Sequence, residues 1–262
     1  MPTLLRLALT ATLIAVATLI SRRWGPATGG AIAGLPLTSG PVSVFLAIDH
    51  GAAFAATAAA ATLWGLLSQA AFCLVYSWVG RWVGWPASAT LAVIAFVATT
   101  VAVSSVALPA GPAFSAVSAI LLAATALFPR TPVVPAGTSP PRWELPLRMA
   151  LATGVVAVLT GAAALLGPRW TGLLSPFPVF ALVLGSFAHR SEGAAAAAAL
   201  LRGVVVGSLS HATMFALVAG LLEHHGLIAT YLWASLGALA VNALGVVAIR
   251  RMPVVAARRA GG

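Results

Sequence analysis

Long apolar segments follow one another along almost the whole chain. A helix crosses the roughly 30 Å hydrocarbon core of a bilayer with about 20 apolar residues. Inside lipid, a helix can satisfy all of its own backbone hydrogen bonds. The pattern therefore predicts an all-α, polytopic membrane protein with about nine transmembrane helices. The nine segments are residues 4–20, 27–48, 52–79, 87–107, 113–128, 146–166, 171–188, 194–222 and 227–249.

Composition excludes a soluble fold. Of the 262 residues, 61% are hydrophobic and only 7% are charged, and the mean hydropathy is +1.04. A soluble domain needs a largely polar surface, which this composition cannot supply. A separate soluble domain would need about 50 residues or more of ordinary composition, and the sequence holds no such stretch.

The basic residues indicate a membrane topology rather than a nucleic-acid partner. All 14 are arginine, the net charge is +10, and they stand in the expected loops and the C-terminal tail. With nine spans, 12 arginines fall on one side and two, Arg6 and Arg169, on the other. If segment 113–128 did not span, the division would be 10 to 4. The positive-inside rule favours nine spans, with the N-terminus outside and the C-terminus in the cytoplasm. The bias toward alanine, arginine and glycine suggests a bacterial inner membrane.

Two of the segments carry helix-breaking residues near their centres. Gly34–Pro41 reads Gly-Leu-Pro-Leu-Thr-Ser-Gly-Pro, and Gly172–Pro178 reads Gly-Leu-Leu-Ser-Pro-Phe-Pro. Proline removes a backbone donor and clashes with the preceding turn, so each helix should break or kink there. Paired interruptions in corresponding places of two halves indicate a transporter binding site. We expect a discontinuous second helix in each half.

The two halves repeat one another. Segment 113–128 would connect two four-helix units, so the second unit would enter the membrane from the opposite face. We therefore expect a 4 + 1 + 4 inverted repeat, with residues 1–112 as the first repeat, 113–145 as a connector helix and proline-rich cytoplasmic loop, and 146–262 as the second repeat and basic tail. At an offset of 142, residues 6–16 align with 148–158, 65–70 with 207–212, and Thr100 with Asn242, whereas Gly34-Leu35 aligns with Gly172-Leu173 at an offset of 138.

One run in the second half resembles a known family. Gly172–Leu182 reads Gly-Leu-Leu-Ser-Pro-Phe-Pro-Val-Phe-Ala-Leu. It is similar to the second helix of the small four-helix bacterial inner-membrane proteins of the GlpM-like family. The first half departs from that pattern, with Leu-Pro-Leu-Thr-Ser-Gly-Pro in the equivalent place. The resemblance implies a fused duplicate of that four-helix unit and carries no activity with it.

Polar residues inside the apolar segments are the candidate site. Polar groups in a bilayer cost free energy and usually face the interior of the bundle. Hydroxyls and freed backbone groups at the breaks could bind a solute, or could only satisfy the kinked backbone. Gln69 and His211 could take part in the same site, or could only hold helices together. The candidate substrate-binding residues are Pro36, Thr38, Ser39, Gly40 and Pro41 at the first break, Ser175, Pro176 and Pro178 at the second, and Ser68, Gln69, Ser210 and His211 on two long helices.

The remaining polar residues do not form a recognisable catalytic group. The sequence shows no nucleophile–base–acid set, no phosphate-binding loop and no cluster of metal ligands. We expect no enzyme activity, no cofactor and no metal, and we expect Asp49 to cap the helix that follows it. Two functions stay open. One is a secondary transporter or channel for a small solute or ion, and the other is a non-transporting scaffold or regulatory factor for cell-envelope polymer synthesis. The expected partner is the lipid bilayer rather than nucleic acid, and a homodimer is left open.

Overall fold

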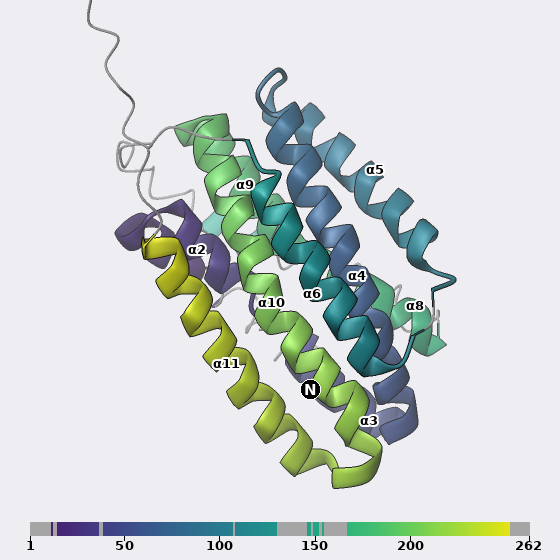
Figure 1. The fold of residues 1–262 in the computed structure, drawn as a ribbon. Coiled ribbons are helices and arrows are strands. Elements are labelled where there is room, and N and C mark those ends of the chain that lie inside the picture. Colours follow the sequence, from purple (N-terminus) through teal and green to yellow (C-terminus); the bar gives the residue numbers. More distant parts are fainter. Residues whose placement is uncertain are drawn as a thin grey trace, which may run out of the picture.

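The structure is a computed structural model, and it describes residues 12, 15–36, 39–106, 108–129, 146–147, 149–151, 154 and 167–251. This part of the chain is helical and contains no strand. The predicted spans 4–20 and 146–166 lie largely outside the described residues. The labelled helices (Figure 1) are α2 (Pro26–Ala33), α3 (Ser39–His50), α4 (Ala52–Val79), α5 (Trp85–Val103), α6 (Ala110–Ala126), α8 (Gly167–Leu174), α9 (Val179–Glu192), α10 (Ala194–His225) and α11 (Leu227–Arg251).

Several helices have the length and composition of membrane spans. In the described part, five stretches qualify, and α6 is a shorter apolar helix of 17 residues. The part of the chain that the structure describes is therefore all-helical, with several helices long and apolar enough to cross a membrane, as expected for a multi-pass membrane protein. The five stretches are Ala52–Val79, Trp85–Val103, Gly167–Glu192, Ala194–His225 and Leu227–Ile249.

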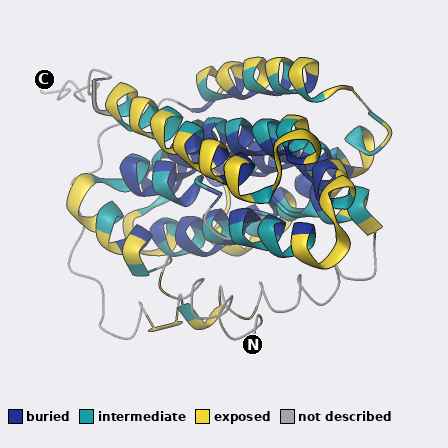
Figure 2. Cartoon of the chain, turned by 90° about the horizontal axis from the view of Figure 1, so that it is seen from below, coloured by how far each residue is buried: buried dark blue, intermediate teal, exposed yellow. Residues whose placement is uncertain are grey.

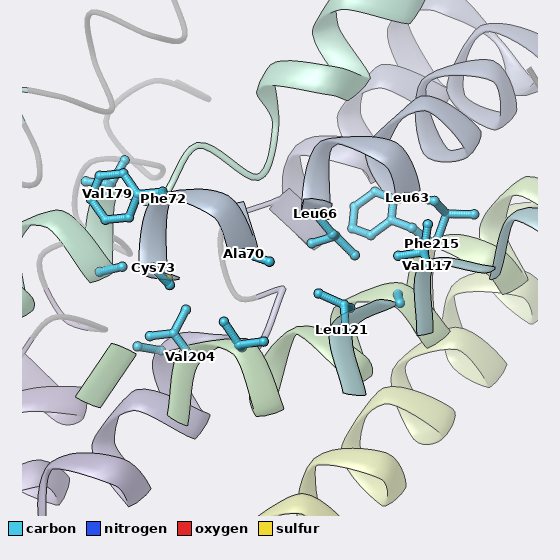
Figure 3. Packing of buried hydrophobic residues seen from close by; sticks show 14 of the residues in the cluster. Leu63, Leu66, Ala70, Phe72, Cys73, Val117, Leu121, Val179, Val204 and Phe215 are labelled. Carbon is cyan, nitrogen blue, oxygen red and sulfur yellow. The ribbon is translucent and has the colours of Figure 1, made fainter. Parts of the chain in front are cut away.

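The two longest helices, α4 and α10, form the centre of the bundle. They run antiparallel and pack against each other, and α6 lies against both (Figure 1). Figure 3 shows where the three helices meet, with Leu66 of α4 beside Leu121 of α6, and Phe215 of α10 beside Leu63 and Val117. All five side chains are buried almost completely. The place where these three helices meet is therefore apolar.

The helices α5 and α11 lie on the outside of the bundle. Helix α5 packs on α4, and α11 packs on α10. Exposed residues gather on such outer helices, whereas the central helices are mostly buried (Figure 2). Apolar side chains remain exposed on both, with Val97 at 52% and Leu244 at 70%. Exposed aliphatic side chains on spanning helices are the expected lipid-facing surface.

Both predicted helix interruptions are present, with boundaries that differ from the expected ones. Helix α2 ends at Ala33 and α3 begins at Ser39, while α8 ends at Leu174 and α9 begins at Val179. Gly40 and Pro41 were expected in the first interruption, but they lie in the first turn of α3. Proline is tolerated there because the first turn has no intrahelical partners for its N–H groups.

Each interrupted helix lies beside the long helix of the other half of the chain. Helix α2 packs on α10, and α8 packs on α4. The contacts between α2 and α10 involve Gly30, Gly34, Gly203 and Gly207, where an added Cβ would approach backbone atoms of the opposite helix to within about 3 Å. Small residues let two helix backbones approach closely in a membrane. We call this arrangement the exchanged packing.

The prediction that Asp49 caps the next helix is wrong. Asp49 is exposed within α3, one residue before the end of that helix. The residue before α4 is Gly51, with φ of 88°, and it makes no side-chain capping bond. The left-handed backbone at Gly51 favours glycine and turns the chain from α3 into α4.

Candidate functional site

The first break places a buried polar pair at the start of α3. The Oγ of Ser39 and the Nε2 of His211 are 3.1 Å apart, and both residues are buried. The backbone of Gly34, at the end of α2, also lies near the imidazole. The ring of Phe215 lies 5.0 Å from the His211 ring. His211 of α10 thus bonds to the start of α3 and lies near the end of α2.

Glycine backbones bring α10 close enough for this contact. A Cβ at Gly34 would approach the carbonyl oxygen of Val204 and the Cα of Gly207. A Cβ at Gly40 would meet the terminal methyl of Met214 at 3.0 Å. The break therefore packs directly on α10 over several turns. His211 lies one turn after Gly207 on the same face, because residues i and i+4 share one side of a helix.

A second polar contact continues along α3. The Oγ of Ser43 and the hydroxyl of Tyr231 are 2.6 Å apart and join α3 to α11. Ser43 is four residues after Ser39, so both hydroxyls lie on one helical face. This pair was not predicted, although the Ser-x-x-x-Ser spacing of Ser39 and Ser43 is visible in the sequence.

The second break is mostly apolar. Pro178 precedes α9 with φ of −82° and ψ of 59°, which is not a helical conformation. A Cβ added to Gly65 would lie 2.9 Å from the Cγ of Pro176, so the proline ring packs closely against α4. The aromatic ring of Phe177 packs edge-on against Phe96 of α5, with centroids 5.1 Å apart. Ser175 is only partly buried at this break.

The polar pairs on the long helices differ in their hydrogen bonds. The hydroxyl of Thr100 donates to the Oγ of Ser68 at 2.9 Å and so joins α5 to α4. The hydroxyl of Ser210 instead donates to the carbonyl of Gly207 in its own helix, at 2.6 Å. Gln69 is only 5% exposed, and its amide has no hydrogen-bond partner within the part of the chain that the structure describes. Ser68 and Ser210 therefore act here as helix contacts, whereas Gln69 is left with unused donors and acceptors.

The predicted site residues are brought together only in part. Ser39, Gly40 and His211 lie together at the first break. Pro36, which is close to Ser39 in sequence, is also buried. Thr38 lies outside the described residues. One site that joins both breaks with Gln69 and His211 stays a prediction. Within the described ranges, no group of three or more histidine, cysteine or acidic residues could hold a metal ion.

The chain was compared with known protein families, curated proteins and solved structures. No protein-family model, no curated protein and no solved structure matches the chain.

Proposed function

We propose that this membrane protein is a secondary transporter or channel for a small solute, with its site at the first helix break. The observation that carries the proposal is the buried Ser39–His211 contact at the start of α3. A histidine in the middle of a spanning helix is costly unless it has a role. Its imidazole can donate or accept a hydrogen bond.

The arrangement of the halves supports an inverted repeat of 4 + 1 + 4 helices. The two interrupted helices, the two long helices and the two outer helices make matching contacts in both halves, including the exchanged packing. Opposed repeats with interrupted helices are the architecture in which transporters hold a solute near the midplane. Gln69 corresponds to His211 under the offset of 142, and its unpartnered amide supports a contact with the solute.

The solute is neutral or carries a single charge. Beside the first break, the described polar groups are uncharged hydroxyls, backbone groups and one imidazole. A dianion would require cationic partners in the low-dielectric interior, where an unpaired charge is costly. The freed carbonyls of the break suit a donor such as a hydroxyl, an amine or a bound proton.

Flux through reconstituted vesicles tests the proposal. The purified chain is placed in liposomes, and stopped-flow light scattering follows glycerol, urea, acetate and ammonium at several pH values. We expect at least one probe to cross faster than in protein-free vesicles. His211→Ala and Ser39→Ala should slow that probe, because each removes one partner of the buried contact.

Matched controls separate the site from general damage. Ser115→Ala removes a hydroxyl from an exposed position of α6, where it bonds only to its own helix, and should leave the flux unchanged. Pro178→Ala should reduce the flux, because it permits a continuous helix through the second break. Normal flux in the His211, Ser39 and Pro178 variants would show that the breaks are packing features and would end the site proposal.

The second candidate function is a non-transporting scaffold for envelope polymer synthesis. Close packing favours it, since α2 and α10 touch through glycine backbones over more than one turn. A bundle packed in this way can hold partner proteins without opening a path. Absence of flux for all four probes, with the protein correctly folded, would support this function instead.

A further inference from the structure

A small cavity lies away from both polar pairs, where α4, α8 and the turn between α5 and α6 meet. Its volume is about 150 Å³. Most of its wall is apolar and includes Ala60 of α4, Leu108 of the turn and Leu173 of α8. Three residues with polar side chains, Thr57, Trp64 and Arg169, also line it. A cavity of this volume holds a molecule of about the size of benzene.

Arg169 brings an uncompensated positive charge to this cavity. Its Nε donates to the carbonyl of Ser104 at 2.6 Å, and its Nη2 donates to the carbonyl of Val106 at 2.9 Å. A guanidinium has five N–H donors in a fixed plane, so these two bonds leave others unused. No acidic side chain in the described ranges forms an ion pair with it. The two carbonyls fix the plane of the guanidinium beside the cavity.

Trp64 supplies a second, independent polar group. The residue is only 8% exposed. Its indole N–H has no hydrogen-bond partner in the part of the chain that the structure describes. A buried indole usually finds a partner for this donor, so the N–H is available to a bound molecule. Two of the residues that line the cavity thus carry unused N–H donors, and most of the other lining residues are apolar.

We propose that this cavity binds a singly charged oxyanion with a short apolar body, such as a small carboxylate. The anion accepts hydrogen bonds from the guanidinium of Arg169 and the indole N–H of Trp64. Its hydrocarbon part fills the space beside Ala60 and Leu173. Charge-assisted bonds to an anion are about twice as strong as neutral ones. Binding here does not depend on transport, so the two proposals fail separately.

The same chemistry can reach the cavity from water or from the bilayer. A free short-chain carboxylate comes from water, and the phosphate diester of an anionic phospholipid comes from the membrane. Both carry one negative charge next to an apolar chain. The two sources are distinguished by offering each of them alone to the purified full-length protein.

The first arm uses hexanoate as the probe, with the protein in an uncharged detergent. A ligand that binds the folded state raises the unfolding temperature in proportion to its concentration and affinity. Hexanoate should raise it, and hexanol, which has the same chain without the charge, should raise it far less. The second arm compares micelles that contain phosphatidylglycerol with micelles that contain phosphatidylcholine.

Two variants connect binding to the cavity. Trp64→Phe keeps an aromatic ring and removes only the N–H, and it should weaken binding about tenfold, the size expected for one bond to a charged group. Trp233→Phe, on the exposed face of α11, is its matched control and should bind like the wild type. Ala60→Leu fills the cavity from a partly exposed position and should abolish binding.

The outcomes decide between support and rejection. Stabilisation by hexanoate or by phosphatidylglycerol that is lost in Ala60→Leu supports the site, and the active arm names the source. If neither probe stabilises the protein, the proposal is wrong. It is equally wrong if Ala60→Leu and Trp64→Phe respond as the wild type does. Should Trp64→Phe fail to fold, the cavity-filling variant alone decides.

Discussion

At the scale of single residues, Gly207 fixes the position of the first break. A Cβ at this position would approach the carbonyl of Ala31 and come within 3.0 Å of the Cα of Gly34. Backbone atoms cannot move aside as the end of a flexible side chain can. The absence of a side chain at Gly207 therefore holds α2 against α10 and keeps Ser39 within reach of His211.

Replacing Gly207 by alanine tests this role. We expect Gly207→Ala to destabilise the folded protein by about 1–3 kcal/mol, the usual cost of overpacking a well-packed contact. It should also reduce any flux that depends on His211. The measurement is the thermal unfolding temperature in a mild detergent, followed by the vesicle assay.

Gly220 provides the matched control on the same helix. A Cβ there would meet nothing within 4 Å. Alanine is favoured over glycine inside a helix by roughly 0.5–1 kcal/mol, so Gly220→Ala should leave the stability unchanged or raise it. If both substitutions had the same effect, the contact between Gly34 and Gly207 would not hold the break in place.

At the scale of the elements, one side chain ties α8 to the end of α5. Arg169 lies in the first turn of α8 and donates to the carbonyls of Ser104 and Val106, just after α5 ends. Carbonyls at and just beyond the end of a helix have no intrahelical partner, and the guanidinium satisfies these two. This contact fixes the start of the second interrupted helix.

Removing the guanidinium should loosen this attachment. Arg169→Gln loses the charge and at least one of the two bonds, and we expect a loss of about 1.5–3 kcal/mol, the range for hydrogen bonds of charged groups. Arg190→Gln, at an exposed position in the last turn of α9, is the control and should be nearly neutral. Equal unfolding temperatures for the two variants would contradict the role of Arg169.

The elements that could be predicted from the sequence are those with strong local signals. Segment 52–79 coincides with α4, and proline and glycine near positions 36 and 176 correctly indicated the two interruptions. The partners of these elements were not predictable, because in lipid both faces of a helix are apolar and hydrophobic periodicity does not show which one packs.

The polar residues of the candidate site were predicted, but the contacts that bring them together were not. Ser39 and His211 were chosen as polar residues in apolar helices, and the structure joins them. The role of Gly34 and Gly207 in joining them was not predictable, because it depends on a close tertiary contact. A Cβ on Gly207 would lie only 3.0 Å from the Cα of Gly34. The bonds of Arg169 to two carbonyls also depend on where a distant turn lies, and no local pattern specifies this.

At the scale of the whole molecule, the proposed nine spans set the two ends of the chain on opposite sides of the membrane. A reporter fused after Gly262 should be cytoplasmic, and one fused at Pro2 should be periplasmic, because 12 of 14 arginines would then lie in the cytoplasm. Fluorescent-protein and alkaline-phosphatase fusions measure the two locations. Both termini on the same side would remove one span and with it the opposed orientation of the repeats.

The exchanged packing also imposes an order of events during synthesis. Ser39 and His211 are 172 positions apart, and a ribosome adds about 5–20 residues per second. The early interrupted helix therefore waits roughly 9–34 s before its partner α10 emerges. Throughout that interval, the glycines of α2 that later pack on α10 have no contact with that helix. The packing of the first half therefore stays incomplete until the last third of the chain, which contains α10, has been synthesised. Until then, lipid or the insertion machinery must cover the surface of α2 that α10 later covers.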